Sequence, residues 1–196
     1  MRLFRVSNWA IGAGLALLAL FTFTGNALAQ DAVRVKFSTT AGAFVVEVYP
    51  DKAPKTVENF LQYVKAKHYD GTIFHRVIDN FMVQGGGFDA KFNQKPTREP
   101  IPLEANNGLK NDVGTIAMAR TSNPNSATSQ FFINVKNNAM LNAPAPDGYG
   151  YTVFGKVVVG MEVIEKIKTT ATGAAGPFSS DVPKTTLLIN SATIEK

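Results

Sequence analysis

Short segments of alternating apolar and polar residues follow one another along most of this chain, and only two stretches between them have helical spacing. The first two segments, residues 33–37 and 43–49, flank a turn at Thr40-Ala41-Gly42 and predict a β-hairpin. A parallel βαβ layout would alternate strand and helix throughout, so this order of elements excludes it. The pattern predicts a mainly-β domain and leaves two architectures open, a closed antiparallel barrel and a sandwich.

Two helices are expected between the strands. Pro54 opens the first, because a proline in the first turn leaves no donor stranded, and apolar residues follow at helical spacing: Val57, Phe60, Leu61 and Val64. The second, Met161 to Lys168, directs three apolar residues inward: Val163, Ile164 and Ile167. Further strands are expected over four ranges: 114–119, 130–135, 151–159 and 185–194. Surface loops are expected over three ranges: 89–111, 142–150 and 171–182.

The first 29 residues have the three parts of a cleavable secretory signal peptide. Arg2 and Arg5 give a positive start, residues 10–23 form an apolar run, and Ala27-Leu28-Ala29 supplies the small residues that a signal peptidase reads. The alternative is an uncleaved membrane anchor, which is disfavoured because the run is short for a transmembrane helix and contains glycines. We therefore expect residues 30–196 to form one exported, periplasmic domain without membrane attachment after cleavage.

Composition restricts the partners and the chemistry. Without Arg2 and Arg5 the net charge falls from +5 to +3, and no dense basic run suggests a nucleic-acid surface. The chain has no cysteine, which rules out disulfides and thiol catalysis. His68 and His75 have no Gly-x-Ser-x-Gly elbow for a catalytic triad and too few partners for a metal site, so His75 is expected to be structural.

One segment sets two polar residues among large apolar side chains. It runs from Phe74 to Asp89, is expected to form two short strands, and contains Arg76 and Gln84. Burying a guanidinium is costly unless it has a function or a partner, so Arg76 is the leading candidate for chemistry. If the loop between the strands is Asp79 to Phe81, Arg76 lies opposite Gln84; a two-residue loop would place Val83 there instead.

This segment resembles the signature of the cyclophilins, and Ser129-Gln130-Phe131-Phe132-Ile133 matches the same family at the expected later position. The resemblance covers about residues 33–196 and is closest to the exported bacterial branch. It implies a closed eight-stranded antiparallel β-barrel capped by two α-helices, one at each end. It also implies a peptidyl-prolyl cis-trans isomerase (rotamase) that acts on proline-containing unfolded or flexible polypeptides during protein folding, without a cofactor or metal.

The resemblance assigns the central residues of an active site. Arg76 matches the catalytic arginine, an always-charged donor to the prolyl nitrogen, whose lone pair leaves conjugation as the bond twists. Four apolar residues match the proline pocket: Phe81, Met82, Phe132 and Leu141. Because neighbours on a strand face opposite ways, Phe132 rather than Phe131 is expected to face this pocket. Gln84 and Gln130 match residues that position substrate or brace the arginine. Ala119 and Arg120 match the edge that hydrogen-bonds extended peptide backbone.

Three positions depart from the eukaryotic members of the family. Met140 stands in place of a tryptophan that contributes to binding the drug cyclosporin, so we expect weak cyclosporin binding. Tyr151 replaces a histidine in the substrate-binding pocket wall. Arg120 replaces a small polar residue, which predicts an altered preference for the residue before proline.

Two other functions remain open from the sequence. A cyclophilin-fold chaperone would bind proline-containing peptides with little turnover, and an intact Arg76 argues against it because binding alone does not need that residue. A secreted structural or adhesion domain would not need a groove of mixed polar and apolar residues. We expect a monomer, since no helix seam or exposed apolar run suggests an interface.

Overall fold

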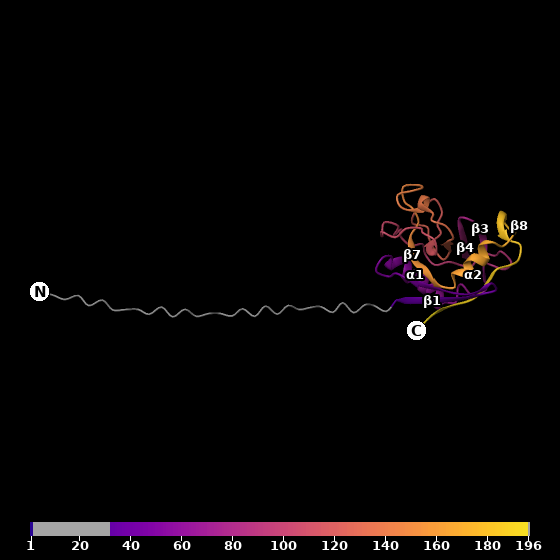
Figure 1. Cartoon of the computed structure of the whole chain (residues 1–196), viewed down its shortest axis with the longest axis horizontal. Coiled ribbons are helices and arrows are strands. Elements are labelled where there is room, and N and C mark those ends of the chain that lie inside the picture. Colours follow the sequence, from indigo (N-terminus) through magenta and orange to yellow (C-terminus); the bar gives the residue numbers. More distant parts are fainter. Residues whose placement is uncertain (2–31, 196) are drawn as a thin grey trace. The chain divides into compact units, whose positions relative to one another are not determined.

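The computed structural model describes Met1 and residues 32–195, and Figure 1 labels several of its helices and strands. The predicted signal peptide, residues 1–29, lies outside the described residues apart from Met1, and so does the predicted mature start, Gln30. Within the described part of the chain, no helix has the length and apolar character needed to cross a membrane.

Eight strands close into a barrel. They are β1 (Val33–Thr39), β2 (Gly42–Val48), β3 (Thr72–Ile78), β4 (Met82–Asp89), β5 (Thr115–Met118), β6 (Phe131–Asn134), β7 (Val153–Val159) and β10 (Leu188–Ile194). Their order around the barrel is β1, β10, β3, β4, β6, β5, β7 and β2, and every neighbouring pair is antiparallel. The predicted eight-stranded closed barrel is confirmed, and the sandwich alternative is wrong.

Both predicted helices form, α1 (Pro54–Lys65) and α2 (Met161–Lys168), and a single 3-10 turn, η1 (Ala139–Leu141), follows β6. Each helix buries an apolar face in the main core: Val57, Phe60 and Val64 from α1, and Val163, Ile164 and Ile167 from α2. Ala53 precedes α1 and makes no side-chain cap. Glu104 takes that role, because its carboxylate accepts hydrogen bonds from the Lys55 and Thr56 amides at 3.1 and 2.8 Å.

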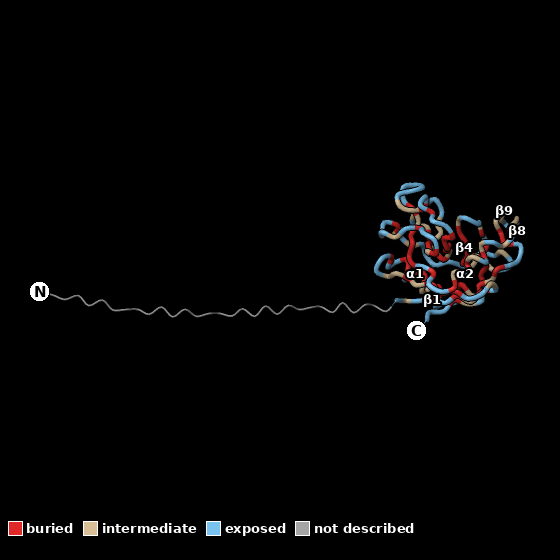
Figure 2. The backbone as a smooth tube through the Cα atoms, in the orientation of Figure 1, coloured by how far each residue is buried: buried red, intermediate tan, exposed pale blue. Residues whose placement is uncertain are grey.

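Large aromatic side chains fill the inside of the barrel. The Phe37 ring stacks on Phe44 at 4.9 Å and contacts Phe131 at 5.5 Å, while Phe60 of α1 contacts Tyr69 at 5.5 Å. All five are buried, and Figure 2 shows the buried backbone following the strands while the exposed stretches lie in the loops. Because a small barrel packed in this way leaves no interior room, a ligand must bind on its outer face.

The expected surface loop over residues 171–182 is wrong. Two further strands, β8 (Thr172–Ala175) and β9 (Phe178–Pro183), form a separate antiparallel ribbon there. Phe178 is what holds it: its ring stacks on His75 at 5.3 Å and meets Phe88 edge-on at 5.1 Å. The sequence pattern misses this ribbon because it packs through few side chains, so most of its residues are exposed or half-buried and do not alternate clearly.

His75 is confirmed as a structural histidine. Its side chain is buried against Phe88 and Phe178, and within the described residues its Nδ1 has no hydrogen-bond partner. Burial lowers the pKa of His75 from 6.5 to about 4. The folded protein therefore keeps this ring neutral at pH values where the unfolded chain would protonate it.

This difference predicts how stability depends on pH. The pKa of His75 is lower in the folded than in the unfolded protein. The contribution of the neutral ring to the free energy of unfolding is therefore complete above pH about 6.5 and is lost as the pH falls toward about 4. Replacing His75 by Phe keeps an aromatic ring in place and removes the titrating group. Between pH 7 and pH 4.5 the free energy of unfolding should therefore fall by about 2–3 kcal/mol less in His75→Phe than in wild type. Urea unfolding at pH 7 and pH 4.5 measures it; an unchanged decline in His75→Phe would contradict the assignment.

Candidate active site

The hairpin of β3 and β4 sets the position of the two polar residues. Its loop is Asp79 to Phe81, with Asn80 in the left-handed region at φ 59° and its amide donating to Asp79 Oδ1 at 2.8 Å. Arg76 pairs with Gln84 across the strands. The register predicted for a three-residue loop is confirmed, and the two-residue alternative, which places Val83 there, is wrong.

The expectation that the Arg76 guanidinium is buried is wrong. Arg76 is exposed, whereas its strand neighbours His75 and Val77 are buried, because alternation along β3 turns Arg76 to the outer face of the barrel. Among the described residues its side chain forms no hydrogen bond and no ion pair. Its donors are therefore free to bind a ligand, at no cost of burying a charge.

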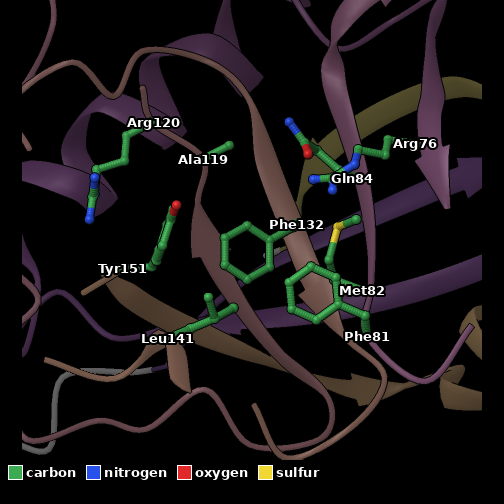
Figure 3. Close-up of a pocket in the computed structure, with 9 residues that line it drawn as sticks. All are labelled: Arg76, Phe81, Met82, Gln84, Ala119, Arg120, Phe132, Leu141 and Tyr151. Atoms are coloured by element: carbon green, nitrogen blue, oxygen red, sulfur yellow. The ribbon is translucent and has the colours of Figure 1, made fainter. Parts of the chain in front are cut away.

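A pocket of about 190 Å³ lies beside this arginine. Nine of the ten predicted site residues line it: Arg76, Phe81, Met82, Gln84, Ala119, Arg120, Phe132, Leu141 and Tyr151. Figure 3 shows the Phe132 ring between the side that carries Arg76 and Gln84 and the side that carries Arg120 and Tyr151. The volume is below the roughly 300–1,000 Å³ typical of drug-sized ligands, so the pocket suits a single side chain.

The apolar part of the pocket is a small core of its own. Met82, Phe132 and Leu141 are buried together with Ala117 and Val153, and Phe81 and Tyr151 pack against them. Phe131 instead belongs to the interior of the barrel, so the expected opposite orientation of the two phenylalanines is confirmed. The result is an apolar recess with an exposed cationic donor at its rim.

Gln130, the tenth predicted residue, does not line this pocket. Its Oε1 accepts a hydrogen bond from Gln84 Nε2 at 3.0 Å, so it contacts the site through Gln84. It lines a neighbouring groove of about 360 Å³, which shares Gln84, Ala119 and Arg120 with the pocket. The groove also includes residues that the sequence analysis did not identify: Gln94, Thr97, Thr121, Ser126 and Thr128.

Gly87 makes room for the bond between the two glutamines. A Cβ at this position would lie 2.5 Å from Gln130 Cγ and 2.6 Å from Gln130 Cδ, closer than such atoms can approach. The Gln130 side chain is therefore the group that the missing side chain of Gly87 accommodates.

The other notable positions contribute to the site less directly. Met140 is 59% exposed on η1 and does not line the pocket, so weak binding of cyclosporin stays a prediction. His68 is buried and its Nε2 lies 3.2 Å from the Gly86 carbonyl oxygen. Burial lowers the pKa of His68 below its ordinary value, which fits a structural contact rather than a proton-transfer role at the pocket.

Comparison with known proteins gives a consistent result. Residues 34–194 match the family described as cyclophilin type peptidyl-prolyl cis-trans isomerase/CLD. Peptidyl-prolyl cis-trans isomerase cyp18 of Streptomyces antibioticus is 55% identical over 162 residues, which is 82% of this chain and 97% of that protein. Peptidyl-prolyl cis-trans isomerase A of Dickeya dadantii is 48% identical over 191 residues, covering 97% of this chain and all of the relative.

A solved structure agrees with these relatives. A Cryptosporidium parvum cyclophilin type peptidyl-prolyl cis-trans isomerase, crystallised in the presence of the dipeptide Ala-Pro, superposes with a TM-score of 0.67 at 26% identity. The match covers 83% of this chain and 99% of that one. The barrel fold and the sequence matches thus agree with each other.

Replacing Gly87 by Ala tests the role of the glutamine pair. The added methyl group must displace Gln130 and break its bond to Gln84, so we expect kcat/KM on an X-Pro test peptide to fall about 10-fold. Gly173→Ala on β8 is the matched control, because the Cβ there meets only Lys184 Cε at 3.4 Å. Wild-type kinetics in a folded Gly87→Ala protein would show that catalysis does not depend on the hydrogen bond between Gln84 and Gln130.

Proposed function

Since this chain belongs to the cyclophilin-type peptidyl-prolyl cis-trans isomerase family, we propose that it isomerises X-Pro bonds of exported proteins by directing Arg76 at the prolyl nitrogen. The chain is a peptidyl-prolyl cis-trans isomerase, the enzyme class of its relatives at 48% and 55% identity. The observation that carries the proposed mechanism is the exposed Arg76 guanidinium at the rim of an apolar pocket sized for one side chain.

Catalysis of this reaction requires only that the proline is held in place and that a charged donor is directed at it. Rotation about an X-Pro bond faces a barrier of about 18–20 kcal/mol and takes on the order of tens to hundreds of seconds without a catalyst. No bond is broken, so the reaction needs no nucleophile, metal or cofactor. A donor that bonds the prolyl nitrogen only when its lone pair has left the amide resonance stabilises the twisted state more than the ground state.

Each part of the pocket has a role in this scheme. The proline ring would enter among Met82, Phe132 and Leu141, with Phe81 closing one side. Arg76 approaches the prolyl nitrogen from the rim with a rigid, permanently charged fork. Gln84, which lies opposite Arg76 on β4 and is held by Gln130, fixes the side from which the fork approaches.

The substrate backbone would lie along the edge after β5. Ala119 donates its amide to the Gln130 carbonyl oxygen at 3.0 Å, which fixes this edge to β6. Within the described residues no hydrogen bond uses the Arg120 amide, so it is free to pair with an extended peptide in the manner of an added strand. Binding through the backbone would let the enzyme accept many proline-containing, unfolded or flexible polypeptides.

Export is the second part of the proposal. The basic start, the apolar run and the Ala27-Leu28-Ala29 site support a signal peptide over residues 1–29 and a periplasmic isomerase domain over residues 30–196. The match to the Dickeya dadantii relative covers 97% of this chain, so it extends into this N-terminal part. The proposed substrates are therefore proteins that fold after crossing the membrane.

Loss of the Arg76 fork should affect turnover and leave binding nearly intact. Arg76→Ala should lower kcat/KM for an X-Pro test peptide by about 10²- to 10³-fold, because it removes one donor aimed at the transition state. Arg76→Lys keeps the charge without the fork and should recover only part of the rate. Arg34→Ala is the matched control, since Arg34 pairs with Glu47 at 3.0 Å in an exposed ion pair on β1 and does not line the pocket.

The same assay separates the isomerase from the chaperone alternative. Peptide binding is measured alongside the cis-to-trans rate, and wild-type protein should both bind and accelerate. A protein that binds the peptide but accelerates it no more than Arg76→Ala would be a proline-peptide-binding chaperone, and the proposed mechanism would then be wrong.

Processing of the leader is tested by expressing the full chain in a Gram-negative bacterium. We expect intact-mass and N-terminal analysis of the periplasmic fraction to give a chain beginning at Gln30. Ala29→Leu should block cleavage, because signal peptidase requires a small residue there. A wild-type chain that keeps Met1 and fractionates with the membrane would favour the uncleaved anchor.

A further inference from the structure

All three nitrogens of the Arg120 guanidinium form hydrogen bonds within the protein. Its Nε and one terminal nitrogen donate to the Gly150 carbonyl oxygen at 3.0 and 2.8 Å, and its other terminal nitrogen donates to the Thr121 carbonyl oxygen at 2.9 Å. The terminal nitrogen that bonds Gly150, Nη2, also pairs with the Asp147 carboxylate at 2.8 Å. The side chain is 1% exposed, although the residue as a whole is half-buried, so its backbone rather than its charge is what remains accessible.

Two of these partners, Asp147 and Gly150, belong to one loop, residues 142–150, whose base is fixed separately. Asn111 Nδ2 donates to the Leu141 carbonyl oxygen at 3.1 Å and to Asn142 Oδ1 at 3.1 Å, and the Tyr151 amide donates to the Leu141 carbonyl oxygen at 2.9 Å. Arg120 reaches this loop from the segment that follows β5. It therefore ties the loop to the edge on which we place the substrate backbone.

The link continues into the pocket through Tyr151. The Arg120 guanidinium carbon lies 4.4 Å from the centre of the Tyr151 ring, a cation-π distance, and this ring meets Phe132 edge-on at 5.7 Å. Figure 3 shows Arg120 and Tyr151 side by side on the wall that faces Arg76 across Phe132. Tyr151 and Phe132 both line the proline pocket.

We propose that Arg120 is a positioning residue: it fastens the 142–150 loop beside the pocket and holds the Tyr151 ring against Phe132, and the substrate residue before proline does not sense its charge. This inference rests on the proposed function, since it concerns the wall of that same pocket. It revises the expectation that the Arg120 side chain alters the preference for the residue before proline.

The electrostatics agree with a neutral clamp. Asp147 lies within 2.8 Å of the Arg120 guanidinium, so a substrate charge nearby meets a compensated pair instead of a free cation. The hydrogen bond from Arg120 holds the pKa of Asp147 below its ordinary value, so the carboxylate stays ionised and the pair stays intact at neutral pH.

The test uses three variants and test peptides that differ only in the residue before proline, which is Ala, Glu or Lys. Arg120→Gln and Arg120→Lys should each lower kcat/KM about 10-fold on all three peptides, mainly by raising KM. Gln removes the charge and most of the donors, and the single ammonium of Lys cannot replace the fork of donors. Asp147→Asn, which leaves one acceptor, should lower it about 3-fold. In every variant the ratio of the Glu and Lys peptides should stay within about 2-fold of wild type, and Arg34→Ala should match wild type throughout.

Other results would overturn the proposal. If Arg120→Lys restores the wild-type rate, or if removing the charge changes the Glu-to-Lys ratio by about 10-fold or more, Arg120 reads substrate charge. If Arg120→Gln matches wild type on all three peptides, the Arg120 side chain has no positioning role in catalysis.

Hydrogen exchange of the loop provides a readout that does not depend on turnover. The amide of Tyr149, which bonds Asp147 Oδ1, should exchange faster in Arg120→Gln and Asp147→Asn than in wild type or Arg34→Ala, because Asp147 is then held less firmly. Unchanged exchange would show that Arg120 does not fasten the loop. A wild-type protein that fails to isomerise any peptide would count against the proposed function alone, and the exchange rates would still decide whether the clamp exists.

Discussion

The strand register on the outer face of the barrel is the constraint on which the site depends. Arg76 on β3 pairs with Gln84 on β4, Gln84 pairs with Phe132 on β6, and Phe132 pairs with Ala117 on β5. Directly paired residues in a sheet point to the same face, so one row carries the cationic donor, its polar neighbour and the apolar floor. A slip of one residue would turn these side chains inward. Barrel closure removes the free edges at which such a slip could begin.

Two kinds of support hold this row in place. From inside, aromatic residues such as Phe37 and Phe131 fill the barrel, so the strands cannot collapse toward one another. From outside, polar side chains fasten loops that have no sheet to pair with. The Asn111 amide holds the base of the 142–150 loop, and Arg120 ties that loop to the edge after β5. The apolar recess is therefore open toward Arg76 and closed on the opposite side.

Periodicity was enough to predict much of this arrangement. The helix from Met161 to Lys168 follows from apolar spacing alone. The hairpin pattern reduced the partner of Arg76 to Gln84 or Val83, and only the structure shows that the loop has three residues and the partner is Gln84. The exposure of Arg76 was not predictable from its apolar surroundings, because composition does not show which face of the sheet carries the pocket. The link between Arg120 and Asp147 joins residues 27 positions apart in two irregular segments, where no periodic pattern exists to reveal it.

The most direct test of the account is a structure of this chain with a bound Ala-Pro dipeptide or longer X-Pro peptide. We predict that the proline ring lies among Met82, Phe132 and Leu141, with an Arg76 nitrogen within hydrogen-bond reach of the prolyl nitrogen or its peptide group. A proline ring bound elsewhere, for example in the open groove between α1 and residues 97–102, would contradict the assignment of the pocket. A ring in the pocket with the Arg76 fork turned away from the peptide would contradict the mechanism.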